Sequence, residues 1–161
     1  MVEEDNAVGI IRNSREPADI NHVTAFERRR GIKLPESYRR FILEQNGGEP
    51  DPNYFEINGF EGGGSLLDYL ADIAPDSTGG LDKLIDMFPG RLPAGFIPIG
   101  LDPGGSLICL GLNAPCEGKI YYWDHEMALD SKGLNKRNMS NMYWLADDIY
   151  ELLNRLADLP E

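Results

Sequence analysis

Three apolar runs between Leu92 and Glu126 constrain the fold of this chain more than any other feature. They are FIPIGL (Phe96 to Leu101), SLICL (Ser106 to Leu110) and KIYYWD (Lys119 to Asp124). Their β-branched, aromatic and aliphatic residues favour strands on a half-buried surface. DPGG separates the first two runs, and Pro and Gly suit the dihedral angles of a tight reversal. The pattern therefore predicts an antiparallel three-stranded meander over residues 96–124.

Apolar residues at helical spacing predict helices packed around this sheet, so the expected fold class is α+β with a mostly antiparallel sheet. The helical stripes begin after Ala18, after Pro35, at Leu81 and after Asp147 or Asp148. Ser65 is expected to cap one more helix, from Leu66 to Ile73.

Two short segments outside the meander have the composition of strands. They are YFEI at residues 54–57 and MYWL at residues 142–145. A chain of 161 residues can build one domain with a substantial core and is too short for two ordinary ones. We therefore expect a single domain over residues 18–159, preceded by a loose segment or a short helix at residues 1–17.

The charge balance is strongly acidic, because 15 Lys and Arg against 27 Asp and Glu give a net charge of −12 at pH 7. Such a chain is expected to repel nucleic acid and anionic membranes, since phosphate contacts need Lys and Arg. It would attract a basic protein, although acidity can also serve solubility alone. No basic signal-peptide region opens the sequence and no apolar run approaches the roughly 20 residues of a membrane span, which predicts a cytoplasmic protein.

The residues that could do chemistry lack the patterns that catalysis needs. Asp124, His125 and Glu126 are adjacent, but neighbours on a strand point to opposite faces, and the other histidine, His22, lies in a predicted helix. This favours a hydrogen-bonded histidine at the rim of the sheet over a metal or catalytic site. The serines lie outside any nucleophile elbow, and no calcium-loop spacing occurs. No enzyme, metal or cofactor is expected.

The glycine-rich loop and the two cysteines favour structural roles. GFEGGG at residues 59–64 could bind phosphate before a helix, but no Lys follows it and Glu61 would repel an anion. A flexible connection or a partner-contact loop is favoured instead. Cys109 is expected to be a buried thiol in a strand, while Cys116 lies in a loop, and a disulfide between them is not required at this size.

Carboxylates are dense in the middle third of the chain and at the predicted strand ends. If several share one face, they form a docking surface for a basic protein, which speeds encounter and enforces specificity. Otherwise they form an ordinary solvated surface. The candidate partner contacts are Glu56, Glu61, Asp68, Asp102, Asp124 and Glu126.

Several stretches, in this order, resemble the SUKH superfamily, whose members include a fungal cell-wall-synthesis regulator and many bacterial immunity proteins. After an early helix with Phe26 and Glu27 come GIKLPESYRRFILEQNGGEP (31–50), LPAGFIPIGLDPGGSLICL (92–110), KIYYWDHE (119–126) and MYWLADDIYELLNRL (142–156). The resemblance spans nearly the whole chain from Ala18 onward. The chain departs from the usual pattern mainly at residues 131–141, where the loop before the last strand is long, and at Asp148, where a small residue often stands.

The resemblance implies an α+β fold and offers no catalytic residue to carry over. It also implies a bacterial immunity protein that binds a cognate toxin, often a nuclease, and neutralises it by stoichiometric inhibition. The alternative is a regulatory or scaffold module that binds an endogenous protein, and an enzyme that uses His125 is a third hypothesis. The toxin, the surface that binds it and the oligomeric state are left open.

Overall fold

The computed structural model describes residues 10–74, 80–135 and 138–160 of the chain. Its centre is a five-stranded antiparallel sheet in which each strand lies beside the next one in sequence. The strands are β5 (Tyr69–Leu70), β6 (Phe96–Leu101), β7 (Leu107–Gly111), β8 (Ile120–Trp123) and β9 (Met142–Ala146). The predicted meander is confirmed as β6, β7 and β8, and the predicted last strand extends it as β9.

Both faces of this sheet are covered, which explains why β7 has an uninterrupted apolar sequence. All of β7 is buried. On β8, Tyr122 and Trp123 are neighbours and point to opposite faces. Tyr122 packs edge-on against Phe55 and Trp123 packs edge-on against Phe88, each with ring centroids 5.9 Å apart. The large aromatic side chains of β8 therefore serve the core.

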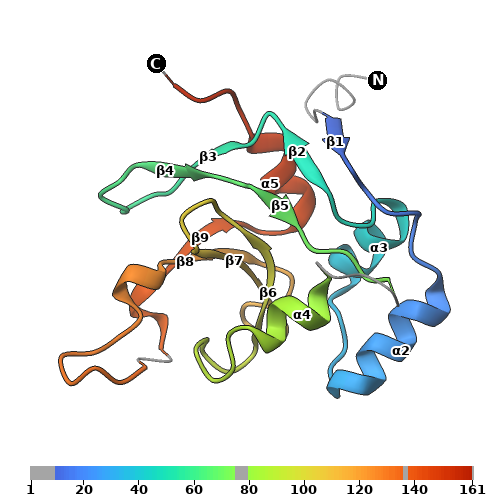
Figure 1. Cartoon of the computed structure of the whole chain (residues 1–161), viewed down its shortest axis with the longest axis horizontal. Helices are drawn as coiled ribbons and strands as arrows, with labels where there is room; N and C mark the ends of the chain where they lie inside the picture. The colour runs from blue at the N-terminus through green and yellow to red at the C-terminus, as the bar shows by residue number, and fades with distance from the viewer. Residues whose placement is uncertain (1–9, 75–79, 136–137, 161) are drawn as a thin grey trace.

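Helices lie around the sheet, which confirms the α+β class (Figure 1). Those in the described ranges are α2 (Ile20–Arg30), α3 (Glu36–Glu44), α4 (Leu81–Asp86) and α5 (Ile149–Arg155). None of the helices in these ranges is long and apolar enough to cross a membrane.

Local sequence signals set the ends of these helices. The Asp19 carboxylate caps α2 by accepting the N–H of Asn21 at 2.7 Å. Gly31 ends α2 in the left-handed conformation, with φ of 67°, as its position after the basic last turn predicts. Asp148 caps α5 by accepting the N–H of Glu151 at 2.8 Å.

The predicted helix at residues 66–73 is wrong. β4 (Gly64–Leu66) pairs with β3 (Tyr54–Glu56), and β5 pairs with β6 at the edge of the central sheet. The N–H of Asp68 donates to the carbonyl of Leu101 at 2.9 Å, and the N–H of Ala71 donates to the carbonyl of Ile99 at 2.8 Å. These pairings with a distant strand override helical spacing, which is only a weak local preference.

The N-terminal segment also differs from the prediction of a loose segment or a short helix. β1 (Ile10–Arg12) forms an antiparallel pair with β2 (Glu49–Asp51). Arg12 reaches Asp51 across this pair, with 3.2 Å between Nη2 and Oδ2. The part of the prediction that covers residues 1–9 lies outside the described residues.

Connections gather on one side of the molecule, at the left of Figure 1. They are the tip of the β3–β4 hairpin (57–63), the β6–β7 turn (102–106), the short 3-10 helix η1 (His125–Met127) and the excursion that follows it (128–135). We call this side the loop face. Helices α2 and α3 lie on the opposite side (Figure 1).

Candidate interaction surface

Asp102 holds the loop face together from inside. Its side chain is buried, with the residue only 5% exposed. Oδ1 accepts the backbone N–H groups of Gly104 (3.0 Å) and Ser106 (2.8 Å), which fixes the β6–β7 turn. Oδ2 accepts the hydroxyl groups of Ser65 on β4 (2.8 Å) and Tyr122 on β8 (2.9 Å). One carboxylate therefore joins the hairpin, the turn and the central sheet.

Tyr122 is a reliable donor in this cluster because it stays protonated. Burial raises the pKa of its phenol to about 12, and the hydrogen bond to the Asp102 carboxylate acts in the same direction. Hydrogen bonds to a charged acceptor are shorter and stronger than neutral ones. The buried charge of Asp102 is thus satisfied by four donors from three segments of chain.

The η1 helix is joined to the same turn through Ser106. The Ser106 Oγ lies 2.8 Å from His125 Nδ1 and accepts the backbone N–H of His125 at 3.1 Å. Asp124 caps η1 by accepting the N–H of Glu126 at 3.0 Å, and the Asn141 side chain donates to the Asp124 carbonyl at 3.0 Å. The prediction that residues 124–126 continue the strand is corrected here, because the side chain of Asp124 begins a helical turn.

The Ser106–His125 pair lacks the arrangement of a catalytic triad. Asp102 bonds to the hydroxyl groups and the turn, and no hydrogen bond within the described residues joins a carboxylate to the ring of His125. Ser106 is itself only 2% exposed. The geometry matches the predicted hydrogen-bonded histidine at the rim, since a nucleophile needs an oriented base and access to substrate.

The described residues form neither a metal-binding cluster nor a disulfide. No group of three or more His, Cys, Asp or Glu in those ranges could hold a metal ion. Both cysteines are free thiols. Cys109 is buried in β7 as predicted, and its burial raises the pKa of the thiol, which keeps it neutral.

The six predicted contact residues divide into two groups. Asp102 and Asp124 are buried, at 5% and 8% exposure, and their carboxylates accept the internal hydrogen bonds described above. The expectation that they touch a partner is therefore corrected: they position the surface from within. The other four are exposed, and their carboxylates make no hydrogen bond or ion pair within the described residues: Glu56, Glu61, Asp68 and Glu126.

On the side of the molecule opposite the loop face, arginines of α2 form ion pairs with aspartates of α4. Arg30 of α2 donates from Nε to Asp82 of α4 at 2.7 Å and from Nη1 to Asp86 at 3.0 Å, and Arg29 also pairs with Asp82. Partial burial of Asp82 acts to raise its pKa, but the bonds from the two arginines outweigh this effect and lower the pKa. The charges of these arginines are therefore paired at α2–α4, whereas Glu61 and Glu126 at the loop face have no ion-pair partner in the part of the chain that the structure describes.

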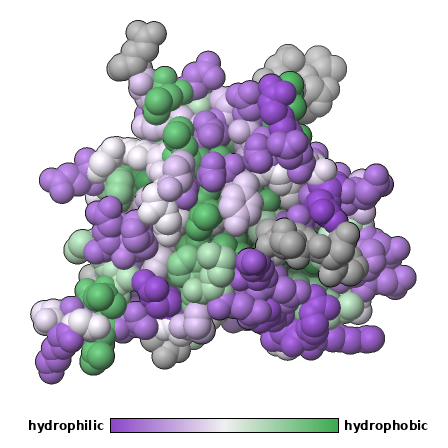
Figure 2. All heavy atoms as spheres, viewed as in Figure 1, coloured by the Kyte–Doolittle hydropathy of each residue, from purple (hydrophilic) through white to green (hydrophobic). Residues whose placement is uncertain are grey.

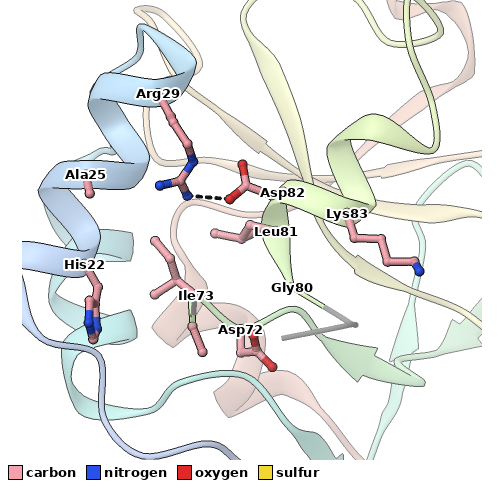
Figure 3. A pocket seen from close by; sticks show the side chains of 10 residues that line it. His22, Ala25, Arg29, Asp72, Ile73, Gly80, Leu81, Asp82 and Lys83 are labelled. Atoms are coloured by element: carbon pink, nitrogen blue, oxygen red, sulfur yellow. Dashed lines mark hydrogen bonds and ion pairs between the residues drawn. The ribbon is translucent and has the colours of Figure 1, made fainter. Parts of the chain in front are cut away.

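A cavity of about 360 Å³ lies between α2 and the start of α4 (Figure 3). His22 and Arg29 extend toward it from α2, and Arg29 pairs with Asp82 at its edge (Figure 3). None of the six predicted contact residues lines this cavity. The predicted surface and the cavity are therefore separate features of the molecule.

With this geometry established, comparison with known proteins identifies the family. The model of the SMI1 / KNR4 family (SUKH-1) matches residues 17–155, which include every helix and strand from α2 to α5. The chain belongs to this family. A relative is the SPbeta prophage-derived uncharacterized protein YokK of Bacillus subtilis (strain 168), 32% identical over 95 residues. The matched segment covers 59% of this chain and 43% of YokK, so the chain matches less than half of that relative's length.

Sequence reasoning missed one component of the loop face. The sequence of residues 127–141 is mostly polar and contains Lys132, Lys136 and Arg137, of which the last two lie outside the described residues. The structure shows that the described part of the excursion also exposes large apolar side chains: Met127, Leu129, Leu134 and Met139. The signal in the sequence was the spacing of these residues among polar neighbours, in a segment with the turn sequence DSKG.

Proposed function

We propose that this chain is an immunity protein that binds a cognate bacterial toxin and neutralises it by stoichiometric inhibition. Membership of the SMI1 / KNR4 family supports this function, because the family includes immunity proteins, and a prophage-derived relative is consistent with it. The observation that carries the proposal is the loop face: exposed carboxylates that have no partner among the described residues, on a surface fixed by buried hydrogen bonds.

The charge of this surface indicates a basic partner. A nuclease needs positive charge to hold the phosphates of its substrate. Carboxylates at Glu56, Glu61, Asp68 and Glu126 would take the place of those phosphates and cover the active site. Complementary charge would steer the encounter and raise the association rate, and the fixed loops would lower the entropy cost of binding.

Inhibition by binding fits the site better than catalysis does. The serine and histidine of the loop face hydrogen-bond to each other and to the backbone in a turn, and the carboxylate beside them is used as a structural acceptor. We therefore propose that the protein is not an enzyme and needs no cofactor. An inhibitor of a nuclease acts where its target cuts, so we place its action in the cytoplasm.

The test uses, as the candidate toxin domain, the product of the gene adjacent to the one for this chain. Cells that express this domain should survive when this chain is co-expressed, and calorimetry on the purified pair should give a 1:1 complex. Loss of toxin activity in vitro should reach completion at one equivalent of this chain.

Two outcomes would count against the proposal. Absence of both binding and protection would overturn it outright. Binding without protection would favour the alternative function, a regulatory or scaffold module for a protein of the same cell.

A further inference from the structure

The excursion after η1 forms an ordered finger, which we define as residues 127–135. Leu129 bridges Asn135 in antiparallel fashion, and the N–H of Asp130 donates to the carbonyl of Leu134 at 2.8 Å. Gly133, with φ of 80°, closes the turn by donating its N–H to the Asp130 carbonyl at 3.0 Å. This is the pattern of a type I turn followed by a left-handed glycine, a common hairpin tip. The finger is therefore shaped before any partner binds.

Its base is anchored in the fold. Ala128 is only 3% exposed. The preceding turn of η1 is held by the Ser106–His125 bonds, and the Asn141 side chain holds the carbonyl of Asp124. A loop that projects from such a base loses little conformational entropy when it is bound.

The finger exposes apolar side chains that the fold does not use. Met127, Leu129 and Leu134 are 52%, 54% and 63% exposed. Among the described residues, eight large hydrophobic side chains are at least 42% exposed, and four of them lie between residues 127 and 139. Figure 2 shows hydrophobic atoms gathered at the lower left, where Figure 1 places this excursion. Apolar patches with a polar rim mark interaction sites.

The pairing indicates the shape of the surface that would bury these side chains. Opposite residues of an antiparallel pair share a face, and successive residues alternate. Leu129 lies opposite Asn135, and Leu134 lies opposite Asp130, so the two leucines point to opposite faces of the finger. A flat surface would bury one of them, whereas a cleft with apolar walls would bury both.

We propose that the finger inserts into an apolar-walled cleft of the basic toxin and is the main anchor of the complex. This proposal rests on the proposed function and specifies how the partner is held. The finger carries one anion and one cation, Asp130 and Lys132, and is itself nearly neutral. Exposed Glu126 precedes it, and exposed Glu61 lies at the tip of the β3–β4 hairpin on the same face. A cleft with a basic rim complements this arrangement.

Charge also argues against other occupants of the same surface. A second copy of this chain would bring together two molecules that each carry a net charge of −12. An anionic bilayer would meet the same repulsion, and its flat surface would leave one leucine exposed. A basic protein with a concave site is the occupant that suits both the charge and the shape.

The experiment measures binding of the neighbouring-gene toxin domain by surface plasmon resonance. The variants Leu129→Ser and Leu134→Ser are compared with Leu159→Ser, because Leu159 is as exposed as Leu134, at 64%, but lies outside the finger. Each finger variant should raise Kd at least 10-fold through faster dissociation, and Leu159→Ser should leave Kd within 2-fold. Unchanged thermal unfolding of all three variants shows that folding is intact.

The remaining outcomes separate this proposal from the proposed function. If the wild-type chain binds and protects but the finger variants do so equally well, the anchor is refuted and the immunity function stands. If the wild-type chain neither binds nor protects, both fail. Loss of self-association in the finger variants, measured by sedimentation, or loss of binding to phosphatidylcholine–phosphatidylglycerol vesicles would assign the finger to a different occupant and overturn the proposal.

Discussion

The hydroxyl of Tyr122 donates to the buried carboxylate of Asp102 across 2.9 Å, and this bond connects strand β8 of the central sheet to the loop face. It crosses between residues 20 positions apart in the sequence. The order of the loop face therefore depends on the interior of the sheet.

Removal of this donor should destabilise the fold. Tyr122→Phe leaves Asp102 Oδ2 with Ser65 as its remaining hydroxyl donor, and a hydrogen bond to a charged group contributes about 1.5–3 kcal/mol. We expect the free energy of unfolding in urea to fall by about that amount. Tyr143→Phe is the matched control, because the Tyr143 hydroxyl makes no hydrogen bond within the described residues. An equal loss in both variants would contradict the role of the Asp102 bond.

Stability should also fall at high pH through Tyr122. Its pKa is raised from 10.0 to about 12 in the folded chain, so the unfolded state ionises first as the pH rises. The contribution of Tyr122 is complete below pH 10 and is lost between about pH 10 and pH 12. The stability gap between the wild type and Tyr122→Phe, measured by urea unfolding, should narrow across this window. A gap that stays constant or widens would refute the assignment, since other titrating groups cancel in the difference.

Two glycines with the same backbone conformation should differ in their tolerance of a side chain. Gly31 and Gly47 have φ of 67° and 73°, but a Cβ at Gly31 meets nothing within 4 Å. At Gly47 it would lie 2.8 Å from the Cβ of Asp72 and 2.9 Å from its backbone nitrogen. We expect Gly31→Ala to cost about 1 kcal/mol of unfolding free energy and Gly47→Ala about 2–4 kcal/mol. The free energies of unfolding are measured by chemical denaturation. Equal losses in Gly31→Ala and Gly47→Ala would show that the segment around Asp72 moves to accommodate the added methyl group.

The exposed carboxylates on the loop face (Glu61 and Glu126) and next to it (Glu56 and Asp68) should govern how fast the toxin is captured. Replacement of Glu56, Glu61, Asp68 and Glu126 by their amides should lower the association rate at least 10-fold at low salt and flatten its dependence on ionic strength. Dissociation should change much less. Stopped-flow measurements on the toxin domain would report both rates.

The control for that experiment is Glu117→Gln. Glu117 is an exposed carboxylate in the loop between β7 and β8, at the other end of the sheet from the β6–β7 turn. The variant Glu117→Gln should change the association rate by less than 2-fold. If Glu117→Gln lowered the association rate as much as the four-residue variant does, net charge and not the loop face would control the encounter.

The sequence was most informative where one segment determines its own structure. The β-branched, aromatic and aliphatic residues of the three apolar runs predicted β6, β7 and β8. Gly31 and the pair Asp147 and Asp148 predicted helix ends, because a cap acts within a few residues of itself. The helix predicted at residues 66–73 failed because its leucines fit either a helix or a strand. Pairing of Tyr69 and Leu70 with the distant β6 decided between them.

The loop face was predicted only in part, for a similar reason. Asp102 and Asp124 looked like exposed turn residues, and their burial follows from donors that come from distant segments, such as Ser65, 37 positions away from Asp102. The exposed apolar residues of the finger could not be separated from core residues by composition. A sequence shows that Leu134 is apolar, but only the packed fold shows that nothing covers it.

The loop face has two layers: a buried one, held by the hydrogen bonds to Asp102, and an exposed one, made of side chains that face solvent. The donors to Asp102 fix the backbone from beneath, whereas the side chains of Glu61, Glu126 and Leu129 are exposed and make no hydrogen bond or ion pair within the described ranges. Exchange of these upper side chains would leave the folding free energy nearly unchanged. A new partner specificity could therefore be introduced by substitution of a few exposed residues, with the same backbone presenting a different chemical surface.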